Sequence, residues 1–202
     1  MPALDHRIAE RAWMSPRVSL NLPNLITLGR LLLVPLAIWL ILDASYAVAF
    51  WVFVAAGLSD GLDGFIAKRF DRRTRLGALL DPIADKTLLV SVFVTLGWVG
   101  ALPKWIVILV VFRDVMIIGG FLLIQTTAAP KRFDPIQISK LNTLGQIALV
   151  GFVLARNGIG FGAAAGGLEF YLTIVVAATT VLSGLCYLVR WARILSRTGE
   201  VL

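Results

Sequence analysis

Four aspartates lie at helical spacing in a chain that is otherwise strongly apolar. Asp60 and Asp63 are three residues apart, and Asp81 and Asp85 are four apart, so each pair would share one face of a helix. The uncharged runs 44–59 and 87–103 adjoin the two pairs. A charged side chain at the centre of a membrane helix costs roughly 2.5–3.5 kcal/mol, so four unpaired ones would cost about 10 kcal/mol. The sequence therefore predicts a partner that neutralises them.

Carboxylate oxygens in this pattern are typical ligands of Mg²⁺ or Mn²⁺. The basic stretch 68–75 can turn the chain, so that two antiparallel helices bring the four carboxylates together and two divalent ions balance their charge. Gly61, Gly64 and Gly77 would let a bulky phosphate group approach the backbone. A site with two such ions is suited to phosphoryl transfer, because the ions can bind phosphate oxygens and stabilise the transition state.

Two other interpretations of the aspartates are open. A single aspartate could snorkel from a helix end or form a salt bridge with a neighbouring arginine, but four in paired register beside three glycines favour a metal site. A cation or proton transporter would also place acids inside a membrane. Repeated halves and interrupted helices at matching positions, which transporters often show, are not found in this sequence.

Composition indicates an integral membrane protein. Of the 202 residues, 58% are apolar and 15% are charged, and the mean hydropathy is +0.86, whereas a soluble domain carries about a quarter charged residues. The single cysteine, Cys186, excludes an internal disulfide, and the single histidine, His6, argues against a zinc site or imidazole catalysis. The formal charge of +7 favours anionic lipid headgroups over nucleic acid as the partner.

The apolar runs predict an all-α bundle of six transmembrane helices. Residues 170–189 form a clean 20-residue uncharged span, and the other runs become long enough only if each helix includes neighbouring charges. We expect helices over residues 22–42, 44–69, 79–101, 104–127, 138–157 and 168–194. Five glycines within 158–167 predict a loop there.

The distribution of basic residues predicts the orientation. Most of the 19 lysines and arginines lie at the two termini and in the second and fourth connections. Both termini and the acidic cluster are therefore expected on the cytoplasmic side, and a bacterial inner membrane suits this arrangement. We expect a transmembrane domain over residues 21–197, preceded by an interfacial segment over 1–20.

The acidic motif resembles a family signature. Asp60-x-x-Asp63-Gly64-x-x-Ala67, followed by Gly77-x-x-x-Asp81-x-x-x-Asp85, is similar to the signature of the CDP-alcohol phosphatidyltransferases. The resemblance implies that the four aspartates bind the metal ions. It also implies that Asp85 is the base that takes the proton of an acceptor hydroxyl, which attacks the phosphorus bonded to diacylglycerol while CMP leaves.

The resemblance also implies contacts with the donor, CDP-diacylglycerol. The family usually has arginine after the alanine, whereas this chain has Lys68 followed by Arg69, so a bidentate contact with phosphate is lost at that position. In the first helix, polar residues near Arg30 could contact the nucleotide or simply mark the helix entry. The expected donor-binding residues are Asn24, Thr27, Gly64, Ala67, Lys68, Arg69 and Gly77.

A second polar group bears on the acceptor. Lys140, Asn142 and Gln146 provide a cation and two amides within two helical turns, enough to hold an anionic polyol. Arg113 precedes Asp114 deep in an apolar run, where the two residues could also form a self-neutralising structural pair. We expect the acceptor-binding residues to be Arg113, Lys140, Asn142 and Gln146.

Around these residues the sequence resembles the CMP-forming cardiolipin synthases, which have Arg-Asp-Val and Ile-Ser-Lys-x-Asn-Thr-x-x-Gln there. The related phosphatidylglycerophosphate synthases usually have Arg-Glu and Gly-Lys-x-Lys-Thr. Loss of the second lysine suits phosphatidylglycerol, with one phosphodiester charge, and glycerol-3-phosphate is the alternative acceptor. The resemblance also implies a homodimer.

Overall fold

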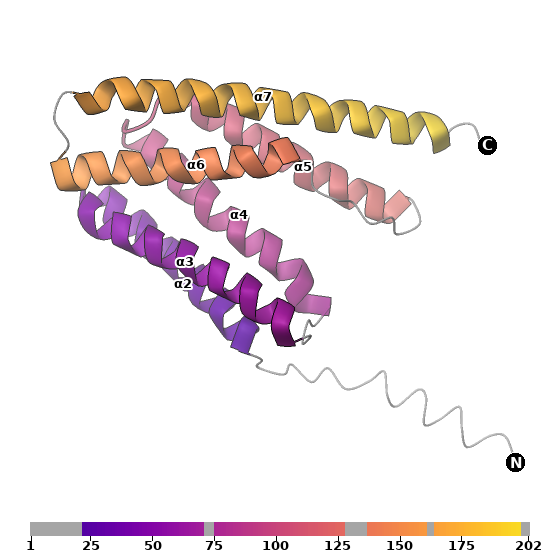
Figure 1. The fold of residues 1–202 in the computed structure, drawn as a ribbon, viewed down its shortest axis with the longest axis horizontal. Coiled ribbons are helices and arrows are strands. Elements are labelled where there is room, and N and C mark those ends of the chain that lie inside the picture. The colour runs from indigo at the N-terminus through magenta and orange to yellow at the C-terminus, as the bar shows by residue number, and fades with distance from the viewer. Residues whose placement is uncertain (1–21, 71–74, 128–136, 161–163, 199–202) are drawn as a thin grey trace, which may run out of the picture.

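The structure is a computed structural model that describes the backbone of residues 22–70, 75–127, 137–160 and 164–198 (Figure 1). Side chains are described for residues 29–59, 86–120, 137–160 and 166–192. The predicted interfacial segment over 1–20 lies outside these ranges.

The described residues form α-helices and one π-helical turn, without strands, so the all-α prediction is confirmed for them. The π-helical turn η1, Arg156–Gly160, directly follows α6. The six α-helices are α2 (Leu22–Leu42), α3 (Tyr46–Phe70), α4 (Arg75–Trp98), α5 (Lys104–Thr127), α6 (Gln137–Ala155) and α7 (Ala164–Thr198).

Two stretches are long and apolar enough to cross a membrane by themselves, Gln137–Gly160 and Gly166–Ala192. Three shorter apolar stretches lie in α2, α3 and α4. These helices are consistent with a membrane protein. The count of six spans and the cytoplasmic position of both termini stay predictions.

The helices form two connected groups. In Figure 1, α6 and α7 run side by side, and α5 packs against α7. On the other side, α2 packs against both α3 and α4. Helices α3 and α4 join the groups, because α3 contacts α6 and the π-helical turn that follows it, and α4 contacts α5 and α6. Both helices of the acidic motif are therefore connected directly to the rest of the bundle.

The core follows the apolar face of α4. Val92, Phe93 and Leu96 are completely buried, and they belong to a cluster that includes residues of all six helices. Side chains that point outward are also large and apolar, Phe112 at 67% exposure among them. Apolar side chains on both the inner and outer surfaces are expected of helices whose surroundings are lipid.

The predicted glycine loop over 158–167 is wrong at both ends. Residues up to Gly160 continue α6 as the π-helical turn, and α7 already begins at Ala164. A Cβ atom at Gly158 would lie 2.2 Å from the backbone nitrogen of Ala47. Gly158 thus allows close backbone contact with the start of α3.

We expect Phe93→Ala to lower the free energy of unfolding by about 3–5 kcal/mol, because it leaves a cavity in the core. Phe112→Ala is the matched control, since the same side chain there is mostly exposed. Thermal or denaturant unfolding in detergent micelles measures the difference. Equal losses in the two variants would contradict the position of the core.

Candidate functional site

The acidic motif occupies the end of one helix and the beginning of the next. Asp60 and Asp63 lie in the C-terminal half of α3, and Asp81 and Asp85 lie in the N-terminal half of α4. Asp63 is seven residues before the end of α3, and Asp81 is six after the start of α4. At 1.5 Å per residue, each is about 10 Å from its helix end. The two pairs therefore lie at similar depth along consecutive helices.

The side chains of the four aspartates lie outside the described residues, so metal binding by them stays a prediction. The side chains of the predicted donor-binding residues lie outside as well, although all seven residues are helical. Asn24 and Thr27 are in α2, Gly64 is in α3 and Gly77 is in α4, while Ala67, Lys68 and Arg69 complete the group in α3. Among the side chains that are described, no group of three or more His, Cys, Asp or Glu could hold a metal.

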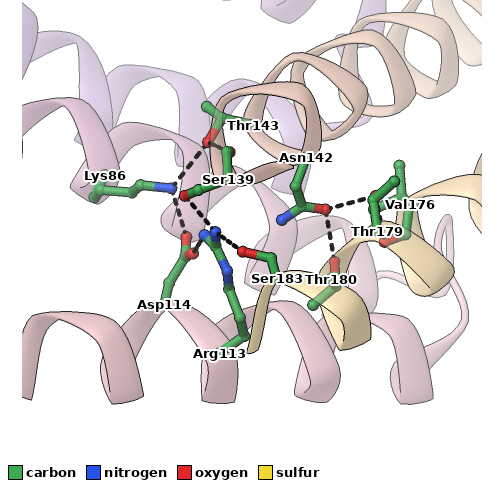
Figure 2. Close-up of polar contacts among 10 residues, drawn as sticks. All are labelled: Lys86, Arg113, Asp114, Ser139, Asn142, Thr143, Val176, Thr179, Thr180 and Ser183. Atoms are coloured by element: carbon green, nitrogen blue, oxygen red, sulfur yellow. Dashed lines mark hydrogen bonds and ion pairs between the residues drawn. The ribbon is translucent and has the colours of Figure 1, made fainter. Parts of the chain in front are cut away.

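A polar network begins one residue after the motif, at Lys86 (Figure 2). The Lys86 Nζ lies 3.0 Å from the Oδ2 of Asp114 in α5 and 3.5 Å from the Oγ1 of Thr143 in α6. Thr143 also donates to the backbone carbonyl of Ser139, at 3.1 Å. Lys86 therefore joins α4 to two other helices immediately beside the predicted base.

Arg113 extends the network to α7. Its side chain is almost fully buried, and one terminal nitrogen donates to Asp114 Oδ1 at 2.5 Å. The other terminal nitrogen donates to Ser139 Oγ at 2.5 Å and to Ser183 Oγ at 2.6 Å. Arg113 and Asp114 thus form the self-neutralising pair that the sequence left open, and they also connect α5 with α6 and α7.

Of the three predicted acceptor-binding residues in α6, two are buried and one is exposed. Asn142 is completely buried, and its Oδ1 accepts hydrogen bonds from Thr179 Oγ1 at 2.9 Å and Thr180 Oγ1 at 2.8 Å. Gln146 is also completely buried, and neither of its amide atoms has a partner among the described residues. Lys140 is exposed. Contact of Arg113 and these three residues with an acceptor stays a prediction.

Sequence reasoning missed Lys86, Thr143 and the two serines that bind Arg113. Lys86 had been grouped with the basic residues of the second connection, and its partners lie 28 and 57 residues away in the chain. A lysine directly after an aspartate of the predicted metal site, at the start of an apolar run, was the available signal. It predicts a charge that needs a buried partner.

A cavity of about 340 Å³ lies between α2, α3, α4 and α6. Arg30, Lys86 and Thr143 supply its polar lining. The remaining walls are mostly apolar, with Phe53, Val54 and Leu58 of α3 on one side and Ile147 and Gly151 of α6 on the other. The cavity thus combines an apolar interior with cationic side chains next to the acidic motif.

Comparison with known proteins agrees with the motif. The family model of the CDP-alcohol phosphatidyltransferases matches residues 20–195. The chain belongs to this family. The resemblance predicted from the aspartate motif, and the assignment to a transferase family, are therefore confirmed.

Its relatives carry two different activity names. A rice protein named CDP-diacylglycerol–glycerol-3-phosphate 3-phosphatidyltransferase 1, chloroplastic, is 31% identical over 96% of this chain and 64% of its own length. A human protein named cardiolipin synthase (CMP-forming) is 32% identical over 76% of this chain and 54% of its own length. A Mycobacterium tuberculosis protein named probable phosphatidylglycerophosphate synthase is 32% identical over 86% of this chain and 82% of its own length. The chain thus spans less than two thirds of the rice and human proteins.

We expect Asp114→Asn to reduce the free energy of unfolding by about 3–5 kcal/mol, because Arg113 and Lys86 lose the carboxylate that both contact in a buried site. Glu169→Gln is the control, since its pair with Arg156 is more exposed and worth about 1 kcal/mol or less. Unfolding in detergent measures both. If the free energy of unfolding falls by a similar amount in both variants, burial does not strengthen the contacts of Asp114.

Proposed function

We propose that this chain transfers a phosphatidyl group from CDP-diacylglycerol to phosphatidylglycerol and releases CMP, which is the reaction of a CMP-forming cardiolipin synthase. The observation that carries the proposal is the four-aspartate motif, which occupies consecutive helices at similar depth in a chain of this family. The activity of phosphatidylglycerophosphate synthase, with glycerol-3-phosphate as acceptor, is the second candidate because relatives with that name also match.

The four carboxylates form a donor set of hard oxygen ligands, which fits two Mg²⁺ or Mn²⁺ ions held by Asp60, Asp63, Asp81 and Asp85. Such ions would neutralise the pyrophosphate of the donor and the charge that develops in the transition state. This two-metal arrangement also removes the cost of four unpaired charges in an apolar bundle.

In this mechanism, Asp85 accepts the proton of the acceptor hydroxyl. The hydroxyl oxygen forms a bond with the phosphorus attached to diacylglycerol, and the bond from that phosphorus to the CMP oxygen breaks. Gly64 and Ala67 lie on the same helix as the first aspartate pair and would lie against the cytidine diphosphate group. Asn24, Thr27, Lys68, Arg69 and Gly77 would complete the donor site.

The preference for phosphatidylglycerol is based on charge. Phosphatidylglycerophosphate synthases usually have a second lysine where this chain has Asn142, and that asparagine accepts two threonine hydrogen bonds. Lys86 and Arg113 share the single carboxylate of Asp114. A neutral asparagine in place of the second lysine lowers the positive charge of the acceptor-binding group by one, which suits a phosphodiester better than the nearly doubly charged phosphate of glycerol-3-phosphate. Arg113, Lys140, Asn142 and Gln146 would bind the headgroup.

We further propose a homodimer in a bacterial inner membrane, with the acidic motif at the cytoplasmic face and no nucleic-acid partner. The distribution of basic residues supports this orientation.

With Mg²⁺ and CDP-diacylglycerol, the purified chain is expected to form cardiolipin and CMP when phosphatidylglycerol is added. Glycerol-3-phosphate should give at least ten times less CMP at equal concentration. Thin-layer chromatography of radiolabelled lipid products distinguishes the two reactions. Product formed with glycerol-3-phosphate alone would replace the proposed acceptor by the second candidate.

Asp85→Asn is expected to lower kcat by a factor of about 100 or more, because an amide cannot accept the hydroxyl proton. Asp43→Asn, at an exposed position in the turn after α2, is the control and should retain full activity. EDTA should abolish CMP release, and Mg²⁺ or Mn²⁺ should restore it. Turnover by Asp85→Asn at the unmodified rate would exclude the assigned base, and activity in EDTA would exclude the metals.

A further inference from the structure

The cavity has a glycine in the wall formed by α3 and another in the wall formed by α6. Gly57 in α3 and Gly151 in α6 both line it, and a Cβ atom built on either would have no atom within 4 Å. Each glycine thus leaves open space beside its helix. Its volume of about 340 Å³ is near the lower end of the range of small-molecule pockets, about 300–1,000 Å³.

Lys86 contributes a positive charge to the lining of this cavity. Two of its three hydrogen-bond donors have partners among the described residues, Asp114 and Thr143. The Lys86 side chain is 26% exposed, whereas Asp114 is 2% exposed. Because Asp114 also binds Arg113, one carboxylate serves two cations, and Lys86 is the cation of this pair that lines the cavity.

We propose that this cavity binds the acceptor lipid, with one alkyl chain between Gly57 and Gly151 and an oxygen of its phosphodiester accepting a hydrogen bond from Lys86. This inference rests on the proposed function and adds the residues that would select a lipid acceptor. An amphipathic occupant matches the lining, since Leu88 and Ile147 are apolar and Lys86 is adjacent to the predicted base, Asp85.

The glycines offer a direct way to fill the cavity. Gly151→Leu and Gly57→Leu each add a side chain from one of the two walls, and the new Cβ atom would meet no atom within 4 Å. The unfolding temperature of each variant shows whether the bundle keeps its packing. Gly119→Leu in α5 is the matched control, because a Cβ atom there also meets nothing within 4 Å and the residue does not line the cavity. Lys86→Met removes the charge and leaves Asp114 paired with Arg113.

The experiment measures equilibrium binding to the full chain in detergent with EDTA present, so that no turnover is needed. Dihexanoyl-phosphatidylglycerol, below its critical micelle concentration, is the lipid probe, and glycerol-3-phosphate supplies a phosphate without alkyl chains. Both cavity-filling variants should weaken lipid binding at least tenfold and change binding of glycerol-3-phosphate by less than twofold. Lys86→Met should weaken binding of the lipid at least tenfold, and Gly119→Leu should change neither ligand.

Unchanged lipid binding in both leucine variants would overturn the inference. So would an equal loss of both probes in a variant that keeps its unfolding temperature, because the cavity would then bind phosphate and not an alkyl chain. Should one leucine variant fail to fold, the other tests the same cavity from the opposite helix. Failure of the proposed function is seen separately, as absence of cardiolipin in the turnover assay while the binding pattern persists.

Discussion

The need to compensate charge inside an apolar bundle governs this structure. Asp114 is almost completely buried. One of its carboxylate oxygens forms an ion pair with Lys86 of α4, and the other forms one with Arg113 of its own helix. Arg113 in turn binds serines of α6 and α7. Because a buried charge without a partner is costly, these contacts fix the relative positions of four helices. Apolar packing alone is less specific between helices whose outer surfaces are also apolar.

This network and the acidic motif share one helix. Lys86 follows Asp85 directly, so its contacts with Asp114 and Thr143 restrain α4 where the predicted base is located. Helix α4 also packs on α2, which in turn packs on α3. Both helices of the motif are therefore held by neighbours, and a site that requires carboxylates from two helices needs such a rigid support.

Much of this fold could be predicted from the sequence. Helices over 22–42 and 104–127 were predicted with the observed ends, because turn residues and prolines bound those apolar runs. Helix α4 was predicted to start at residue 79 but starts at Arg75. The prediction followed the apolar residues, whereas the helix continues into the polar residues that precede them. The family followed from the spacing of the aspartates. The partners of Lys86 could not be predicted, because periodicity along one helix does not show which neighbouring helix its face meets.

Position 142 shows how the interior could set the charge of the acceptor. The Asn142 oxygen lies within hydrogen-bond distance of the Thr179 and Thr180 hydroxyl groups, and Thr179 can also donate to backbone carbonyls of its own helix. Lysine has three donors and no acceptor, and it would add a positive charge at a completely buried position. A bundle with lysine at 142 would have to bind a more negative ligand or reorganise the contact between α6 and α7. Asparagine instead keeps position 142 uncharged, and its side-chain oxygen links α6 to the two threonines of α7.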